Sequence, residues 1–236
     1  MPDIFPNSPL DGTYIKDDFL SNSAVADATV GELGWEMVTI ANASTPSFVA
    51  AQNGIMRITT AGTADGDGEA FVLHPDAIVL SGTNQVIRCR VRYPDISGNQ
   101  LAGNNFRIGF STSVTAAEPA VGVWIDSDAG VISFDGASTN GDISQAAANV
   151  STLTSGTTMV LGTFHDLAIH MEGVNANGGP KTLKLFCDGE LAGTIENFLL
   201  GSTETMELSI VHWQDSGSAD DLELDIDYIE CWLPRN

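Results

Sequence analysis

Basic residues are scarce in this chain of 236 residues. It has nine Lys and Arg against 31 Asp and Glu, which gives a formal net charge of −22 at pH 7. A surface of that sign repels phosphate backbones and anionic lipids, so we expect the chain to bind neither nucleic acid nor membranes. The sequence also has no apolar run long enough to cross a bilayer as a helix. Self-avoidance at high concentration is the simplest use of such a charge.

Cysteine is equally scarce. Cys89, Cys187 and Cys231 each fall within an alternating apolar run, and no Cys-x-x-Cys occurs. An odd number at these positions predicts three buried free thiols, and the missing motif argues against a zinc site. The N-terminus, Met-Pro-Asp-Ile-Phe-Pro, lacks a basic segment followed by an apolar stretch, so we expect no Sec signal peptide.

Motifs of common enzymes are missing as well. The four histidines show neither His-x-His nor His-Glu-x-x-His spacing, and the chain has no Gly-x-Ser-x-Gly elbow and no phosphate-binding glycine loop. We therefore predict ordinary structural histidines and no hydrolase of the serine or zinc type.

Long helical periodicity is also absent, whereas strand periodicity recurs along the chain. The stretches 85–93, 105–111 and 164–172 alternate apolar and polar residues, and Gly, Asn and Asp cluster between such runs. This pattern predicts an all-β fold, a two-sheet antiparallel sandwich, over residues 18–236. Residues 1–17 carry three prolines and no periodicity, which predicts an extended N-terminal arm.

One hairpin stands out, in the segment 182–198. Asp188-Gly189 separates two alternating runs and favours a type I′ turn, because both central residues tolerate positive φ. Such a turn places Phe186 opposite Leu191 and Leu185 opposite Ala192.

Two runs of charge predict an ion-pair ladder. Arg88, Arg90 and Arg92 share one face of a strand, and Glu223, Asp225 and Asp227 share one face of the last strand. Both runs have a period of two, so adjacent antiparallel strands would interleave them.

Two further groups are candidates for ligand binding. Trp124 alternates against Val123 and Ile125, so its indole is expected on the face away from the core, where it could stack on a sugar; Trp213 is similar. The alternative for both is a packed or interface aromatic. Asp65, Asp67 and Glu69 alternate with glycines in one loop, an arrangement that could bind calcium (Ca²⁺); Asp126 and Asp128 are a further pair, and otherwise no cofactor is expected.

An ordered set of motifs resembles a known family. The set comprises Asp-Asp-Phe-Leu at 17–20, Gly-Glu-Leu-Gly-Trp at 31–35, Arg-Cys-Arg-Val-Arg-Tyr at 88–93, Phe-Arg-Ile-Gly-Phe-Ser at 106–111, the run 183–192 and the closing run 224–232. Together they resemble the concanavalin A-like (laminin G-like) jelly rolls of tailed-bacteriophage virion proteins. The resemblance covers roughly residues 17–233.

The resemblance implies a structural role in a phage particle. We expect a capsid decoration or cement protein on the virion surface, assembled in the host cytoplasm, that contacts major capsid or tail proteins and can form a homo-oligomer. No enzymatic activity is expected.

Two alternatives remain open. One is a lectin-like module that binds a host-surface glycan through Trp124 and Trp213. The other is a hydrolase similar to the family 16 glycoside hydrolases, whose Glu-x-Asp-x-Glu strand the run from Glu223 to Asp227 resembles, with Asp at the third position.

Overall fold

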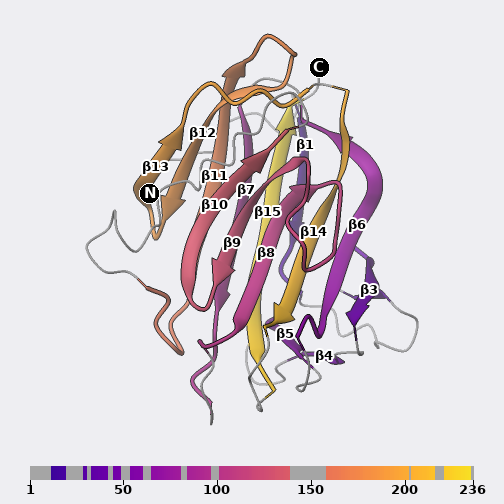
Figure 1. Cartoon of the computed structure of the whole chain (residues 1–236), viewed down its shortest axis with the longest axis vertical. Helices are drawn as coiled ribbons and strands as arrows, with labels where there is room; N and C mark the ends of the chain where they lie inside the picture. Colours follow the sequence, from indigo (N-terminus) through magenta and orange to yellow (C-terminus); the bar gives the residue numbers. More distant parts are fainter. Residues whose placement is uncertain are drawn as a thin grey trace.

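The computed structural model describes residues 12–19, 29–30, 33–41, 45–48, 54–60, 65–80, 84–96, 101–138, 158–201, 203–215 and 221–234. These residues form strands and connecting turns without any helix, so they offer no helix that could cross a membrane. All strand pairs are antiparallel, and the strands form two sheets that lie face to face (Figure 1). The predicted all-β sandwich is confirmed.

The first sheet has the strand order β13-β12-β11-β7-β15-β5-β4, and β1 also pairs with β15. Its strands are β1 (Gly12–Asp17), β4 (Thr45–Phe48), β5 (Met56–Thr59), β7 (Gln85–Arg92), β11 (His165–Val174), β12 (Pro180–Cys187), β13 (Glu190–Ile195) and β15 (Glu223–Pro234).

The second sheet has the order β10-β9-β8-β14-β6-β3-β2. Its strands are β2 (Thr29–Val30), β3 (Trp35–Ala41), β6 (Gly68–Val79), β8 (Asn104–Ser111), β9 (Gly122–Asp128), β10 (Val131–Ala137) and β14 (Thr205–Gln214).

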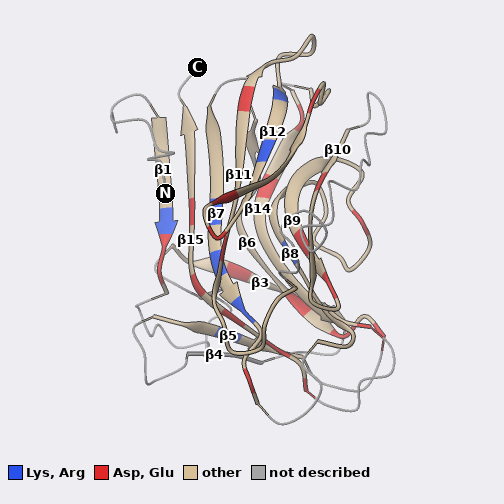
Figure 2. Cartoon of the chain, turned by 90° about the vertical axis from the view of Figure 1, so that its left-hand side faces the viewer, with Lys and Arg blue, Asp and Glu red and all other residues tan. Residues whose placement is uncertain are grey.

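The core lies between the sheets and follows from strand alternation. Ile87, Cys89 and Val91 of β7 point into it, and the arginines between them point outward. All three cysteines are buried and free, as predicted. Figure 2 shows the basic residues of the described chain mainly on strands of the first sheet, with one on β8.

The β12–β13 hairpin forms as predicted in its turn and differs further along. Asp188 and Gly189 both have positive φ, 50° and 86°, which a type I′ turn requires. Phe186 is opposite Leu191, whereas Leu185 is opposite Gly193 and not Ala192. A register shift between Leu185 and Phe186 causes the difference, because a bulge adds one residue to the opposing strand.

The sheet begins earlier than the sequence indicates. Gly12–Asp17 pairs with β15 over six residues, from Gly12 opposite Pro234 to Asp17 opposite Ile229. This strand falls within the segment 1–17, for which the prolines and the lack of alternation predict an extended arm. The first part of that segment, residues 1–11, lies outside the described residues.

Candidate functional site

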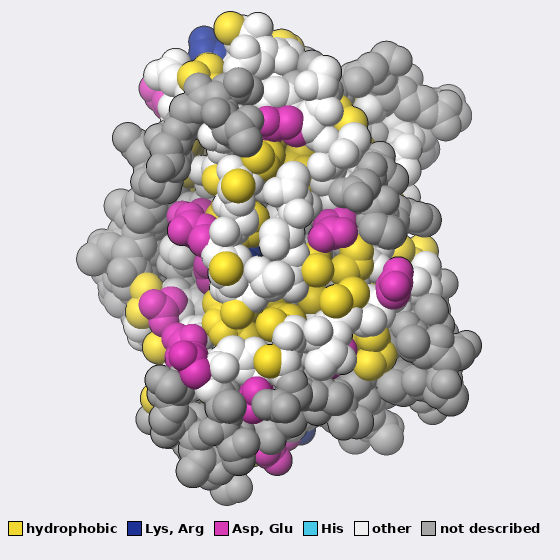
Figure 3. Space-filling model, turned by 45° about the vertical axis from the view of Figure 1, so that its right-hand side comes forward, with side chains coloured by type: hydrophobic (Ala, Val, Ile, Leu, Met, Phe, Trp, Pro, Cys, Tyr) yellow, Lys and Arg dark blue, Asp and Glu magenta, His cyan; other side chains and the backbone are white. Residues whose placement is uncertain are grey.

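The outer face of the second sheet carries a hollow that we call the groove. It is a cavity of about 500 Å³, and its lining consists of Asn105, Arg107, Ala116, Glu118, Asp126, Asp128, Asp135, Trp213 and Asp215. Figure 3 views this side of the molecule, where acidic side chains surround a hollowed centre and hydrophobic side chains lie beside it.

Strand register brings the polar residues of the groove together. Arg107 on β8 lies opposite Asp126 on β9 and opposite Val211 on β14. Asp135 on β10 lies opposite Trp124, the residue two positions before Asp126. Because residues opposite one another share a face, all of these side chains leave the sheet on the side away from the core.

Arg107 occupies the centre of the groove and is only 3% exposed. Its guanidinium carbon lies 5.4 Å from the ring centroid of Trp124 and 5.1 Å from that of Trp213, so both indoles contact the cation. Its Nη1 donates to the carbonyl oxygens of Thr115 (3.2 Å) and Ala117 (3.0 Å). Burial lowers the pKa of Arg107. The arginine is therefore a fixed part of the groove floor.

Each of the two indoles has a glycine as its cross-strand partner. Gly109 lies opposite Trp124 and Gly68 opposite Trp213. A Cβ on Gly109 would lie 2.3 Å from the carbonyl oxygen of Val123, and one on Gly68 would lie 2.2 Å from that of His212. The backbones approach so closely that no side chain fits at these two positions, on the β8 side of Trp124 and the β6 side of Trp213.

Two buried donors in this region have no acceptor among the described residues. They are Nε of Arg107 and Nε1 of Trp124, whose side chain is fully buried. Buried polar groups in proteins are almost always hydrogen-bonded, so unpaired donors beside a cavity indicate a ligand or ordered water.

The carboxylates of the groove repel one another. The pKa of Asp126 is raised to about 7, mainly by burial; Arg107, whose Nη2 lies 3.7 Å away, lowers it, and Asp135 and Asp128 add to the rise. Burial also raises the pKa of Asp135, to which the Ser133 hydroxyl donates at 3.3 Å, and Glu118 adds to that rise. Near neutral pH the Asp126 carboxyl is therefore protonated in part of the molecules.

The two tryptophans predicted to bind sugar differ in their access to the groove. Both lie on the outer face of the second sheet, but Trp124 is 0% exposed under Arg107, so its ring has no surface open to a sugar. Trp213 is 8% exposed and lines the groove.

The predicted calcium ligands do not converge. Asp65 is exposed in a turn, whereas Asp67 and Glu69 are buried. Glu69 accepts a hydrogen bond from the Thr39 hydroxyl at 3.1 Å. Their ligand atoms do not form a converging group within the part of the chain that the structure describes. Asp126 and Asp128, the further pair, both line the groove.

The predicted ladder residues lie on the outer face of the first sheet, where β7 and β15 are neighbours. Arg92 Nε lies 2.9 Å from Asp225, and Arg90 Nη1 lies 2.8 Å from Asp227. The two ends of the ladder differ from the interleaved pattern. Arg88 contacts Glu230 (3.3 Å) and Asp166 (2.9 Å), and Glu223 contacts Arg57 of β5 at 2.7 Å. A bulge between Ile226 and Tyr228 shifts the register and places Glu230 opposite Arg88. Glu223 lies beyond the last residue of β7, where β15 pairs with β5.

This location also bears on the hydrolase alternative. Glu223 and Asp227 lie on the opposite side of the sandwich from the groove, and each has an arginine partner. A pair of catalytic carboxyls needs an open cleft for the sugar chain. The groove carboxylates line a cavity, whereas Glu223 and Asp227 are each held by an arginine.

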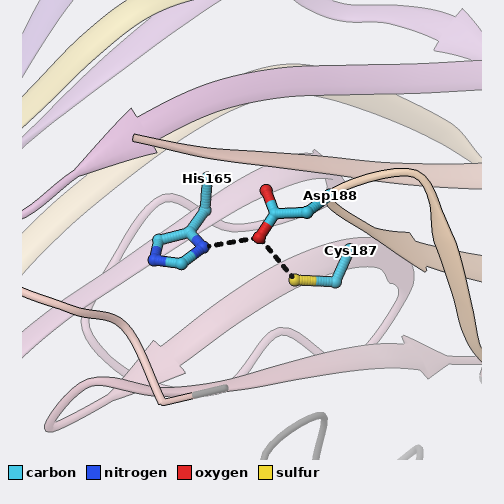
Figure 4. A group of neighbouring side chains, drawn as sticks. All are labelled: His165, Cys187 and Asp188. Carbon is cyan, nitrogen blue, oxygen red and sulfur yellow. Dashed lines mark hydrogen bonds and ion pairs between the residues drawn. The ribbon is translucent and has the colours of Figure 1, made fainter. Parts of the chain in front are cut away.

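A second group of side chains joins β11 to the β12–β13 turn (Figure 4). His165 Nδ1 lies 2.8 Å from Asp188 Oδ2, and the Cys187 thiol lies 3.8 Å from the same oxygen. The Val160 amide donates to His165 Nε2 at 3.3 Å, which assigns the ring proton to Nδ1. A metal ion bound to Nδ1 would require the ring proton on Nε2. That nitrogen could then no longer accept the hydrogen bond from the Val160 amide. The pattern therefore suits a structural hydrogen bond and not a metal centre.

The sequence patterns indicate only part of the groove. They single out Trp213 as a sugar-binding candidate and Asp126 and Asp128 as calcium ligands, but they give no signal for Arg107, Glu118, Asp135 and Asp215. Arg107 is the only basic residue on the strands of the second sheet, yet the sequence alone does not assign strands to sheets.

The solved structures that the chain resembles share its architecture. The carbohydrate recognition domain of Emp47p has a TM-score of 0.58 at 10% identity, over 98% of this chain and 100% of that one. An endo-1,3-beta-glucanase from Streptomyces sioyaensis has a TM-score of 0.59 at 14% identity, over 98% and 100%. SO2946 from Shewanella oneidensis MR-1, a protein of unknown function, has a TM-score of 0.63 at 12% identity, over 95% and 87%. No family model and no curated protein matches the sequence.

These structures correct one prediction and leave two unsupported. The expectation that the chain is not an enzyme is overturned, because the similar structures include this glucanase and an endo-beta-1,4-glucuronan lyase from Trichoderma reesei. A phage origin and a capsid role receive no support from them. The recognition domain of Emp46p is similar in a potassium-bound and in a metal-free form, so this fold can hold a metal in other proteins. At such low identities the likeness shows the fold alone, and that fold is the concanavalin A-like jelly roll of lectin and glucanase domains.

Proposed function

We propose that this chain binds a glycan in the groove on the outer face of the second sheet. The observation that carries the proposal is an unpaired donor, Arg107 Nε, in a cavity lined with carboxylates and Trp213. Sugars offer hydroxyl groups that both accept from such donors and donate to carboxylates, and their apolar ring faces contact aromatic side chains. The carbohydrate recognition domain of Emp47p, which has the same fold, supports this class of ligand.

Binding to a glycan array, followed by calorimetry with the best ligand, tests the proposal. Asp135→Asn and Trp213→Phe should each weaken binding by about tenfold or more, because each removes a contact from the groove. Asp227→Asn on the first sheet is the matched control and should bind as the unaltered protein does. Circular dichroism of every variant shows whether the fold is kept. Equal affinity of all three variants, or no glycan bound at all, would contradict the proposal.

A second function fits the same groove, namely cleavage of the bound glycan. Asp126 and Asp135 are diagonal neighbours on β9 and β10, a position in which Cα atoms are about 7–8 Å apart. Glycosidases use two carboxyl groups separated by roughly 5–9.5 Å, one of them protonated. With a pKa raised to about 7, Asp126 can supply the proton, and Asp135 can act as base or nucleophile.

Release of reducing ends or of unsaturated products from polysaccharides tests this second function. Asp126→Asn should abolish product release and leave glycan binding measurable, whereas loss of both would indicate a role in binding only. Glu223→Gln serves as the control, since that side chain lies outside the groove.

The place on a virion surface stays a prediction from the sequence motifs. A glycan-binding groove would suit adsorption of a particle to a host surface as well as a free protein. Mass spectrometry of purified particles tests the location: many copies per particle support decoration, and absence from particles refutes it.

A further inference from the structure

In the groove, five carboxylates gather around a single cation. They come from Glu118, Asp126, Asp128, Asp135 and Asp215, and the cation is the Arg107 guanidinium. On the first sheet, five carboxylates lie within ion-pair distance of Arg57, Arg88, Arg90 or Arg92, namely those of Asp166, Glu223, Asp225, Asp227 and Glu230. Figure 2 shows this division of charge between the two sheets.

The one cation of the groove is largely committed to other contacts. Arg107 lies between two indoles, donates to two carbonyl oxygens, and comes only within 3.7 Å of Asp126. Among the described residues, no ion pair joins any of the other four carboxylates to a basic side chain. Burial is the main cause of the raised pKa values of Asp126 and Asp135, and repulsion from neighbouring carboxylates adds to both rises. A ligand with positive charge would relieve that repulsion.

The carboxylates are spread along the groove and are not gathered at one point. Within the described residues, no three of them bring ligand oxygens within 4.8 Å of one another, a distance that a metal site would require. Positive charges spaced along an extended ligand match this distribution better than one small ion does. The unpaired Nε of Arg107 adds a donor suited to a hydroxyl or ring oxygen.

We infer that the groove selects glycans that carry free amino groups, such as chains of glucosamine, and rejects chains of uronic acids. This inference rests on the proposed glycan binding and adds the charge class of the ligand. Ammonium groups pair with Asp128, Asp135 and Glu118, while hydroxyl groups meet Arg107 and Trp213. A uronate chain would place carboxylates against those of the groove, where like charges repel.

Calorimetry with three hexasaccharides tests the inference: glucosamine, N-acetylglucosamine and glucuronate chains, at pH 6 in low and high salt. The glucosamine chain should bind about tenfold more tightly than its acetylated form, with the difference falling in high salt, and the glucuronate chain should bind least. Glu118→Gln combined with Asp128→Asn should remove the preference for the amine. Glu190→Gln, an exposed carboxylate on β13, controls for overall charge and should keep it.

The outcomes distinguish the two proposals. Equal binding of the glucosamine and N-acetylglucosamine chains overturns the inference and leaves glycan binding intact. If no hexasaccharide binds and the glycan array is also blank, both fail. Titration with Ca²⁺ alone is the third arm: a calcium ion that occupies the groove and abolishes the preference for the amine would also overturn the inference.

Discussion

Asp126 is a carboxyl group whose burial outweighs the attraction of a nearby arginine. Its pKa rises from 3.8 to about 7, so the folded protein holds a proton that the unfolded chain releases. The contribution to stability is therefore full below about pH 4 and is lost as the pH rises to about 7, by at most roughly 4 kcal/mol at 1.4 kcal/mol per pKa unit. Urea unfolding of the unaltered protein and Asp126→Asn over this range checks it. The difference in unfolding free energy should change with pH, and parallel curves would refute the assignment.

His212 gives stability the opposite dependence on pH. It is fully buried, its Nε2 lies 2.8 Å from Asn104 Oδ1, and burial lowers its pKa from 6.5 to about 3. The unfolded imidazole takes up a proton below pH 6.5 and the folded one does not, so stability is lost as the pH falls from 6.5 towards 3. His212→Gln should flatten this acid loss in unfolding measurements. His170→Gln, at a partly exposed histidine, should change it much less; an equal effect of both would count against burial as the cause.

At the scale of the strand, two aspartates of β15 should contribute unequally to the free energy of unfolding. Asp225 is 0% exposed and lies between Arg57 (2.6 Å) and Arg92 (2.9 Å), whereas Asp227 is 25% exposed with a partner that is 42% exposed. Asp225→Asn should lower the unfolding free energy by about 3 kcal/mol or more, because it leaves two arginines facing a neutral partner. Asp227→Asn should cost less than about 1 kcal/mol. Urea unfolding should give clearly different unfolding free energies for the two variants. Equal losses would show that burial does not determine how much each aspartate stabilises the fold.

The same strand shows which features of the fold the sequence patterns predict and which they do not. Alternation in β7 and β15 predicts their faces, and the Asp188-Gly189 turn predicts the local register of its hairpin. The bulge before Tyr228 has no clear signal in the sequence, so Glu230 and not the predicted acidic residues lies opposite Arg88. Glu223 pairs with Arg57 because β15 also pairs with the short strand β5, a neighbour that alternation does not predict. Register beyond a bulge depends on tertiary packing, which local periodicity does not record.

The groove escaped prediction because it depends on strand order. Arg107 and Trp213 are neighbours only because β8 and β14 lie side by side, although more than 100 residues separate them in the chain. Alternation says which residues share a face of their own strand, but not which strands are adjacent. The outward position of Trp124 was therefore predictable, and its cover by Arg107 was not.

For the whole molecule, the two outer faces divide the charge between them. Five carboxylates of the first sheet pair with arginines, and the second sheet has Arg107 as its only strand cation. The negative charge is thus less compensated in the groove, because four of its five carboxylates have no ion-pair partner among the described residues. The overall acidity alone indicates only self-avoidance. The division of charge between the two faces shows where carboxylates without ion-pair partners gather, namely in the groove.

The two sheets also depend on one buried carboxylate, Asp17, at the end of β1. Its oxygens accept hydrogen bonds from the amide of Phe19 (2.8 Å), the amide of Leu33 (3.2 Å) and the indole of Trp35 (2.9 Å), which begins β3 in the other sheet. Asp17→Ala leaves these donors without an acceptor, and each buried unpaired donor costs about 1–3 kcal/mol, so the variant should lose roughly 3 kcal/mol or more.

Asp18→Ala is the matched control for this tie between the sheets. Asp18 is one residue away, and its contact with Lys16 is long, at 4.0 Å, and exposed. Its removal should cost less than about 1 kcal/mol. Denaturant unfolding followed by Trp fluorescence compares the two variants, and similar midpoints would mean that β1 and β3 are held together by other contacts. If Asp17→Ala is the less stable variant, the segment predicted to be an extended arm contains a residue that joins the first sheet to the second.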